Sequence, residues 1–201
     1  MKLNSESELR ALYGFAKGRA VSKELGAFEQ HSIRYVELSP FVVISSVGRN
    51  GDLDSSPRGG EPGFVKVLDS HTLLIPDSKG NNRLDSLVNI IETSKLGCLF
   101  MIPGIDETLR VNGLASITTQ GDYLELFSAE RNPPKAVIEM KVTSVYLHCA
   151  KAFMRSKLWS NDSVIERTNL PTMSQMINDQ TGGKIVIETQ QKMVSRYQKD
   201  L

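Results

Sequence analysis

"ETLRVNGLASITT", residues 107–119, predicts a long β-strand with an irregularity near its middle. Apolar and β-branched side chains recur along the segment, and Asn112-Gly113 is typical of a bend or bulge. A second segment, "AVIEMKVTSVYLH" (residues 136–148), alternates well enough between apolar and polar residues to form another long strand. We therefore expect each of these two segments to form one strand of a β-sheet.

The remaining segments extend this sheet and flank it with helices. Residues 40–48 and 96–103 each predict one strand, and residues 64–76 predict a hairpin of two. Short connections favour antiparallel pairing, and six such strands suggest a small β-barrel. Helices are expected at residues 5–28, 84–91, 149–159 and in the C-terminal part of the chain. Residues 49–63 read as a long polar loop.

Composition narrows the function without identifying it. The 201 residues are 40% hydrophobic and 23% charged, which suits a globular chain with a real core. The net charge of +1 gives no sign of a nucleic-acid partner. The N-terminal stretch is not a secretory signal, no apolar run is long enough for a membrane span, and Cys98 and Cys149 are far apart. These features predict a cytoplasmic protein with reduced thiols.

A polar loop followed by a helix, "PDSKGNNRLDSLVNI" (residues 76–90), allows two interpretations. Asn81 or Asn82 could cap the helix, with Arg83 solvated. The same amides and guanidinium could instead hold a phosphate at the helix N-terminus. The apolar face of this helix is expected to consist of Leu84, Leu87, Val88 and Ile91.

Three further segments are candidate sites. The glycine-rich segment 56–66 is either a plain turn or a place where a flat ligand approaches the backbone. Arg110 is either solvated or faces a ligand. Lys151 and Arg155 share a helix face close to Trp159, which could hold an anionic aromatic ligand or could simply lie in the core. His148 and Cys149 lack a third ligand nearby, so we expect no metal site. No catalytic triad or nucleotide-binding motif occurs, which points to cofactor chemistry if the protein is an enzyme.

Four blocks in sequence resemble the pyridoxamine 5′-phosphate oxidase-like flavoproteins, and more narrowly their FMN-dependent subgroup. The blocks are "DLDSSPRGGEPGFV" (52–65), "LLIPDSKGNNRLDSLVNI" (73–90), "GCLFMIPGIDETLRVNG" (97–113) and "HCAKAFMRSKLW" (148–159). The resemblance covers about residues 25–160 and leaves the tail at 161–201 without a motif. It implies a mainly β fold with flanking helices, built on a six-stranded antiparallel split β-barrel.

The resemblance also implies a homodimer with FMN in two clefts at its interface, and it assigns residues to those clefts. By this resemblance the strand that contacts the flavin is Gly63, Phe64, Val65 and Lys66, and the segment beneath the ring is Ile75, Pro76 and Asp77. The phosphate contacts are Asn81, Asn82 and Arg83. Thr108 and Arg110 reach across from the partner chain, and Arg155, Ser156 and Trp159 close the cleft. The phosphate triplet has one cation where the oxidase has two, and Arg58 could supply the other.

The function implied is that of an FMN-binding oxidoreductase acting on a small-molecule substrate or electron donor. The oxidase's arginine and histidine for pyridoxine phosphate are not found after Trp159, so another substrate is expected. Two alternatives remain open: a flavin-binding or sensing protein without turnover, and a split barrel that binds haem, with His148 as its ligand, or a deazaflavin. Three parts are predicted: a helical segment at 1–30, a flavin-binding domain at 31–160 and a helical extension at 161–201.

Overall fold

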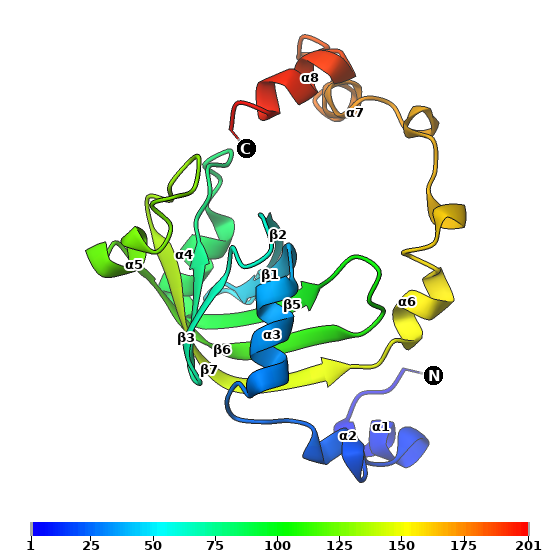
Figure 1. Ribbon diagram of the computed structural model, residues 1–201. Coiled ribbons are helices and arrows are strands. Elements are labelled where there is room, and N and C mark those ends of the chain that lie inside the picture. The colour runs from blue at the N-terminus through cyan, green and yellow to red at the C-terminus, as the bar shows by residue number, and fades with distance from the viewer. Residues whose placement is uncertain (1, 201) are drawn as a thin grey trace.

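A single antiparallel sheet forms the body of the protein in the computed structural model, which describes residues 2–200 (Figure 1). Met1 and Leu201, the outer ends of the two predicted terminal segments, lie outside the described residues. The strands are β1 (Phe41–Val47), β2 (Leu53–Gly59), β3 (Lys66–Asp69), β4 (Thr72–Pro76), β5 (Lys95–Met101), β6 (Thr108–Thr118) and β7 (Val137–His148). The helices are α1 (Glu6–Tyr13), α2 (Arg19–Ser22), α3 (Gln30–Leu38), α4 (Asp85–Thr93), α5 (Gly121–Glu125), α6 (Lys151–Ser156), α7 (Met173–Gln180) and α8 (Gln190–Tyr197), with 3₁₀ turns η1 (Asn161–Ser163) and η2 (Arg167–Asn169).

The described sheet has seven strands, so the prediction of six was wrong. The strand order is β2-β1-β5-β6-β7-β4-β3, and every neighbouring pair is antiparallel. The additional strand is β2, which lies within the segment expected to be a loop. As an edge strand it pairs only with β1, so it tolerates Pro57 and a polar sequence that a central strand would not.

The predicted irregularity at Asn112-Gly113 is confirmed and bends the sheet. The register between β6 and β7 shifts at this point. A Cβ atom on Gly113 would lie only 2.1 Å from the carbonyl oxygen of Lys141, so the close approach of the two backbones requires glycine. Before the bulge β6 pairs with β5, and beyond it β7 pairs with β4. The two long strands therefore link two halves of the sheet.

The core lies between the inner face of the sheet and helices α3 and α4. Alternating residues of β1, β5, β6 and β7 supply most of it, including Ile44, Phe100, Val111 and Met140, all fully buried. Helix α3, which the sequence pattern did not predict, contributes Val36. Its start is fixed by Glu29, whose side chain accepts hydrogen bonds from the backbone of His31 and Ser32.

Helix α4 turns a different face inward from the one predicted. Leu87 and Ile90 are buried, whereas Leu84, Val88 and Ile91 are 49%, 50% and 73% exposed. The prediction for α4 also placed its cap incorrectly. The N-cap residue is Leu84 with a φ of 61°, and neither Asn81 nor Asn82 caps the helix. The left-handed backbone at Asn82 and Leu84 delays the start of the helix and rotates its faces.

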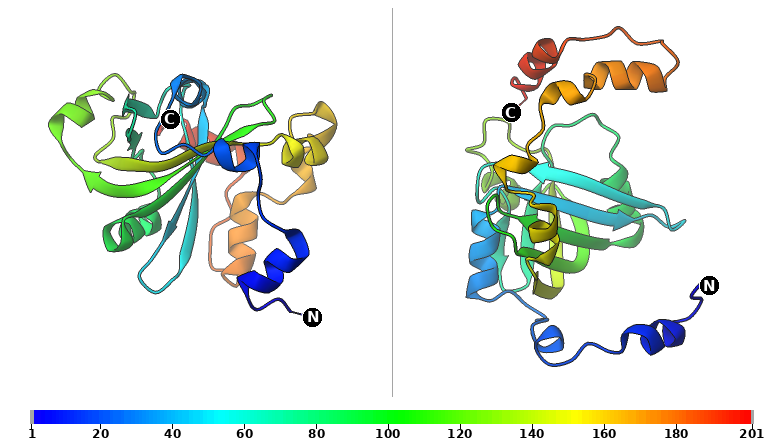
Figure 2. Two further views of the ribbon diagram at one scale, coloured as in Figure 1. Left: turned by 90° about the horizontal axis from the view of Figure 1, so that it is seen from below. Right: turned by 90° about the vertical axis from the view of Figure 1, so that its right-hand side faces the viewer.

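The two terminal segments leave the body of the molecule (Figures 1 and 2). The single helical run predicted for residues 5–28 is broken into α1 and α2, because Gly14 and Gly18 both have positive φ angles. The C-terminal segment runs in a wide arc from α6 to α8. Its end returns to the loop after β4, where Lys79 pairs with Asp200. In residues 2–200, no helix has both the length and the apolar character needed to cross a membrane.

Candidate functional site

An ion pair joins two of the four sequence blocks. Arg58 in β2 donates from Nη1 to Oδ1 of Asp77, directly after β4, over 2.9 Å. The two side chains are only 18% and 21% exposed. The Nε atom of Arg58 is buried and, among the described residues, has no hydrogen-bond partner. An orphaned buried donor of this kind calls for a missing partner.

The segment from Gly63 to Lys66 contributes backbone rather than side chains. Gly63 has a φ of 85°, and the side chains of Phe64 and Val65 are core residues at 5% and 2% exposure. The Nζ atom of Lys66 lies 5.9 Å from the centre of the Phe127 ring. Any ligand bound against this segment would therefore contact its main-chain groups.

Ile75 and Pro76 at the end of β4 are likewise buried. Neither side chain is exposed, so only their main chain and the polar Asp77 remain for contact with a ligand. This explains why an apolar strand and a polar loop meet abruptly at residue 77.

The loop ahead of α4 already pairs its polar groups internally. The side-chain oxygen of Asn81 accepts from the backbone N–H of Arg83 over 3.1 Å, and Asn82 has a φ of 60°. Arg83 is 76% exposed and contacts Asp85 over 2.8 Å, from Nε to Oδ2. Because Leu84 offers no side-chain cap, no cap side chain competes for the N–H groups in the first turn of α4.

Helix α4 is tied to the edge strand by one further contact. The hydroxyl of Ser86 donates to Oδ2 of Asp54 in β2. The register of β2 against β1 places Asp54, Ser56 and Arg58 on the side of the sheet that faces the core. Three predicted segments thus converge here, around 58, 77 and 81–83, and Asp54 and Ser86 join them without having been singled out in the sequence.

The other predicted residues lie elsewhere in the chain. Thr108 and Arg110 belong to the first half of β6, and Arg155, Ser156 and Trp159 belong to or follow α6. Trp159 donates from its indole N–H to the Ile105 carbonyl over 3.0 Å and stacks on Phe153, while the Ser156 hydroxyl donates to the Phe153 carbonyl. Within residues 2–200, no hydrogen bond, ion pair or ring contact links these residues to Arg58, Asp77 or the loop at 81–83.

Arg110 contacts Tyr146, and Lys23 approaches the same ring; the sequence singled out neither of these two residues. Its Nη1 donates to the Tyr146 hydroxyl over 2.9 Å, and the ammonium of Lys23 lies 5.6 Å from the centre of the same ring. The alternation of residues 136–148 places Tyr146 and His148 on one strand face, which was the available signal for Tyr146. No signal in the sequence indicated Lys23, because it approaches the Tyr146 ring from a segment remote in sequence.

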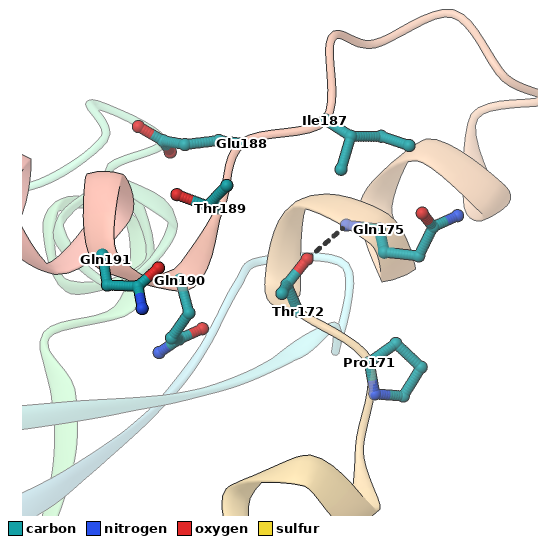
Figure 3. A pocket seen from close by; sticks show the side chains of 8 residues that line it. All are labelled: Pro171, Thr172, Gln175, Ile187, Glu188, Thr189, Gln190 and Gln191. Carbon is teal, nitrogen blue, oxygen red and sulfur yellow. Dashed lines mark hydrogen bonds between the residues drawn. The ribbon is translucent and has the colours of Figure 1, made fainter.

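Neither a metal centre nor the hollow in the C-terminal tail explains these residues. The described part of the chain has no group of three or more histidine, cysteine, aspartate or glutamate side chains that could hold a metal ion. A hollow of about 490 Å³ lies in the C-terminal tail between the start of α7 and the start of α8 (Figure 3). The Thr172 side chain there caps α7 by accepting a hydrogen bond from the N–H of Gln175. The tail hollow includes none of the predicted site residues.

A comparison with protein-family models identifies the body of the chain. The model described as pyridoxamine 5′-phosphate oxidase matches residues 29–149. The chain belongs to the pyridoxamine 5′-phosphate oxidase family. The matched range begins at the cap of α3 and ends just after β7, so it contains all seven strands of the described sheet. Helix α6 and the tail lie outside the family match.

Solved structures support the family fold. The HupZ protein of Group A Streptococcus is 17% identical, with a TM-score of 0.50, covering 59% of this chain and 91% of HupZ. A candidate pyridoxamine 5′-phosphate oxidase from Lactobacillus delbrueckii is 19% identical, with a TM-score of 0.48, covering 62% of this chain and 98% of that protein. At such identities HupZ shows a shared fold and nothing about activity. No curated protein matches the chain.

Proposed function

We propose that this member of the oxidase family binds FMN and uses it in oxidation–reduction. The observation that carries the proposal is the Arg58–Asp77 pair, because it brings the 52–65 and 73–90 blocks together at one place within the family domain. In this proposal the backbone at Gly63 and the loop Asn81–Arg83 belong to the same flavin site. Bound flavin would supply the electron transfer that no catalytic side chain in the sequence offers.

The polar groups at this place suit a phosphate. The orphaned Nε of Arg58 and the uncapped first turn of α4 both present donors, and a helix N-terminus favours an anion. Arg83 would add a second cation once it exchanges Asp85 for the ligand. In this proposal Arg58 supplies the charge that the Asn-Asn-Arg triplet lacks.

We propose further that two copies of the chain complete each site. Within one chain, Thr108, Arg110, Arg155 and Trp159 do not contact the Arg58 group, and a second copy could bring them to it. The outer face of the sheet carries Phe41, Val43, Leu99 and Met101, which are only partly buried. Apolar side chains at that position suit a protein interface. A homodimer with FMN at its interface satisfies both observations.

The absorption spectrum of the purified protein tests the cofactor. We expect the flavin bands to be present, or to be restored when the protein is incubated with FMN and desalted. Light scattering during gel filtration tests the dimer. A colourless protein that FMN cannot reconstitute would contradict the proposal.

A second experiment tests turnover. We expect a reduced nicotinamide nucleotide to bleach the flavin bands, and an added acceptor to restore them. A protein that binds FMN but shows no such cycle with any donor tried would instead be a flavin-binding or sensing protein. Pyridoxine phosphate serves as the negative control and should not be oxidised, because the residues that would recognise it are not found after Trp159.

A further inference from the structure

A cluster of cationic and aromatic side chains lies on the outer face of the sheet, where β6 and β7 run together. The register aligns Arg110 with Tyr146 and Thr108 with His148 across the two strands. The Arg110 guanidinium lies 5.5 Å from the centre of the Tyr146 ring, and the His148 ring lies 5.5 Å from the same centre. Side chains from two strands therefore surround one phenol.

Lys23 brings a second permanent positive charge to the cluster. The backbone of Leu25 pairs with Val145 through two hydrogen bonds of 2.9 and 2.8 Å, which hold this segment against the open edge of β7. Lys23 then donates to the Leu147 carbonyl over 2.6 Å and places its ammonium over the Tyr146 ring. A segment far away in sequence is thus anchored so that its lysine joins Arg110.

The positive charges of the cluster have no carboxylate partner within residues 2–200. Neither Arg110 nor Lys23 forms an ion pair there. The nearby Glu24 carboxylate instead accepts a hydrogen bond from the Ser144 hydroxyl. Two cations beside one ring repel each other, and an anion between or near them would offset this repulsion.

His148 lies within the same excess of positive charge, and one of its ring nitrogens lacks a polar partner within residues 2–200. Burial lowers the pKa of its imidazole, and the charges of Arg110 and Lys23 lower it further. Its Nε2 atom is buried and lacks a hydrogen-bond partner among the described residues. The missing partner calls for a polar group beside the ring, and the excess of positive charge favours an anion there.

A hollow on the same face has room for the rest of a ligand. The next row across the sheet consists of Ser45, Gly97, Asn112 and Ser144, one alternation away from the row that contains Arg110. Ser45, Gly97 and Asn112 line an open hollow of about 330 Å³ with Thr143 and Lys95. Gly97 has no side chain there, and the Asn112 amide lies against it, with Oδ1 3.2 Å from where a Cβ of residue 97 would be.

We propose that Arg110, Lys23, Tyr146 and His148 bind a carboxylate or phosphate group of a small ligand whose body lies in the neighbouring hollow. The anion site stands on its own geometry. Its assignment to a substrate rests on the proposed function, which brings this face to the flavin of a partner chain. In that case the substrate class is a small molecule with an anionic head and a polar body.

Histidine resonances in a proton NMR spectrum provide the test. The chain has three histidines, so His31 and His71, which are exposed and lie outside the cluster, serve as internal controls. The protein as purified is titrated at pH 7.5 and constant ionic strength, once with inorganic phosphate and once with acetate. We expect the His148 ring signals to move and saturate with at least one anion, while the other two histidines stay in place. Saturation with phosphate alone indicates a phosphorylated ligand, and saturation with acetate indicates a carboxylate.

Two substitutions locate the effect. Arg110→Gln removes the charge-assisted hydrogen bond and should weaken the anion by about 10-fold or more. Arg110→Lys keeps the positive charge and should retain part of the affinity. The matched control Arg34→Gln, on the exposed face of α3, should leave the titration unchanged. Unchanged dispersion of the backbone amide signals shows that each variant is folded.

Three results would overturn the anion site: no saturation with either anion, equal movement of all three histidines, or saturation that survives Arg110→Gln. These results are separable from failure of the proposed function. A colourless protein whose His148 signals still saturate would keep the anion site and remove the flavin. A flavin-bound protein whose His148 signals do not saturate would keep the flavin and remove the anion site.

Discussion

Arg58 and Asp77 connect opposite ends of the sheet. Arg58 belongs to β2, one edge strand, and Asp77 follows β4, the neighbour of the other edge strand, yet their charged groups lie 2.9 Å apart. The pair can form only because the sheet coils strongly enough to bring its edges together. The loop that leads to α4 begins at Asp77, so it starts beside this contact.

Removing one member of this pair should destabilise the fold. We expect Arg58→Met to lower the free energy of unfolding by about 1–3 kcal/mol, because it leaves the Asp77 carboxylate mostly buried and unpaired. Urea unfolding followed by circular dichroism measures the change. The double variant with Asp77→Leu should recover part of the loss. Arg34→Met, whose pair with Glu37 is exposed, should change stability by less than about 0.5 kcal/mol.

Gly113→Ala should be among the most damaging small substitutions in the chain. The added Cβ would lie 2.1 Å from the Lys141 carbonyl oxygen, which is backbone and cannot move without breaking the β6–β7 pairing. We expect a loss of about 2–4 kcal/mol in the free energy of unfolding. Gly121→Ala is the control, because the Cβ that alanine adds at that position would have no neighbouring atom within 4 Å. Equal stability of the two variants would contradict the account of the bulge.

Arg83→Ala should weaken FMN and leave riboflavin unaffected. A charge-assisted phosphate contact contributes about 1.5–3 kcal/mol, or roughly 10- to 150-fold in affinity. Riboflavin lacks the phosphate and so reports whether the loss is specific to that group. Fluorescence quenching of free flavin measures both affinities. Asp85→Asn should tighten FMN, since Arg83 then no longer has to leave a carboxylate. An Arg83→Ala variant with unchanged FMN affinity would remove this loop from the phosphate site.

Tyr35 should make stability fall at high pH. Burial, and then the charge of Glu107, raises the pKa of its hydroxyl from 10.0 to about 12 in the folded protein. The folded state therefore keeps a proton that the unfolded state releases, so this contribution is complete below pH 10 and disappears as the pH rises towards 12. Urea unfolding at several pH values between 9 and 12 measures the slope. Tyr35→Phe, which also loses the hydrogen bond to the Glu107 carbonyl, should flatten it.

The two thiols should differ sharply in reactivity. Cys98 is 2% exposed, and burial raises its pKa to about 12, whereas Cys149 is exposed. Because the thiolate is the reactive form, a disulfide reagent should modify one thiol per chain rapidly and the second only on unfolding. Cys149→Ser should abolish the rapid phase. Rapid modification of both thiols in the native protein would contradict the burial of Cys98.

Local pattern was enough to predict most strands. Apolar and β-branched runs identified the segments of β1, β5 and β6, alternation identified β7, and the pair Asn112-Gly113 identified the bulge, because each feature depends on neighbours in sequence. Strand β2 was missed since an edge strand, held by one partner, can be polar and contain proline. The inward face of α4 was wrong because Leu84 adopts a left-handed conformation that shifts the start of the helix.

The sequence by itself determined the family, most of the antiparallel strands and the polar loop before α4, because motifs and periodicity are local properties of the chain. Only the tertiary structure decided which of those residues meet. Coiling of the sheet brings Arg58 to Asp77, and the Leu25–Val145 pairing brings Lys23 to Arg110 and Tyr146. The same packing buries the side chains of Phe64, Val65 and Ile75, leaving their backbone for a ligand. Contacts between segments distant in sequence depend on the curvature and register of the whole sheet, which no short stretch specifies.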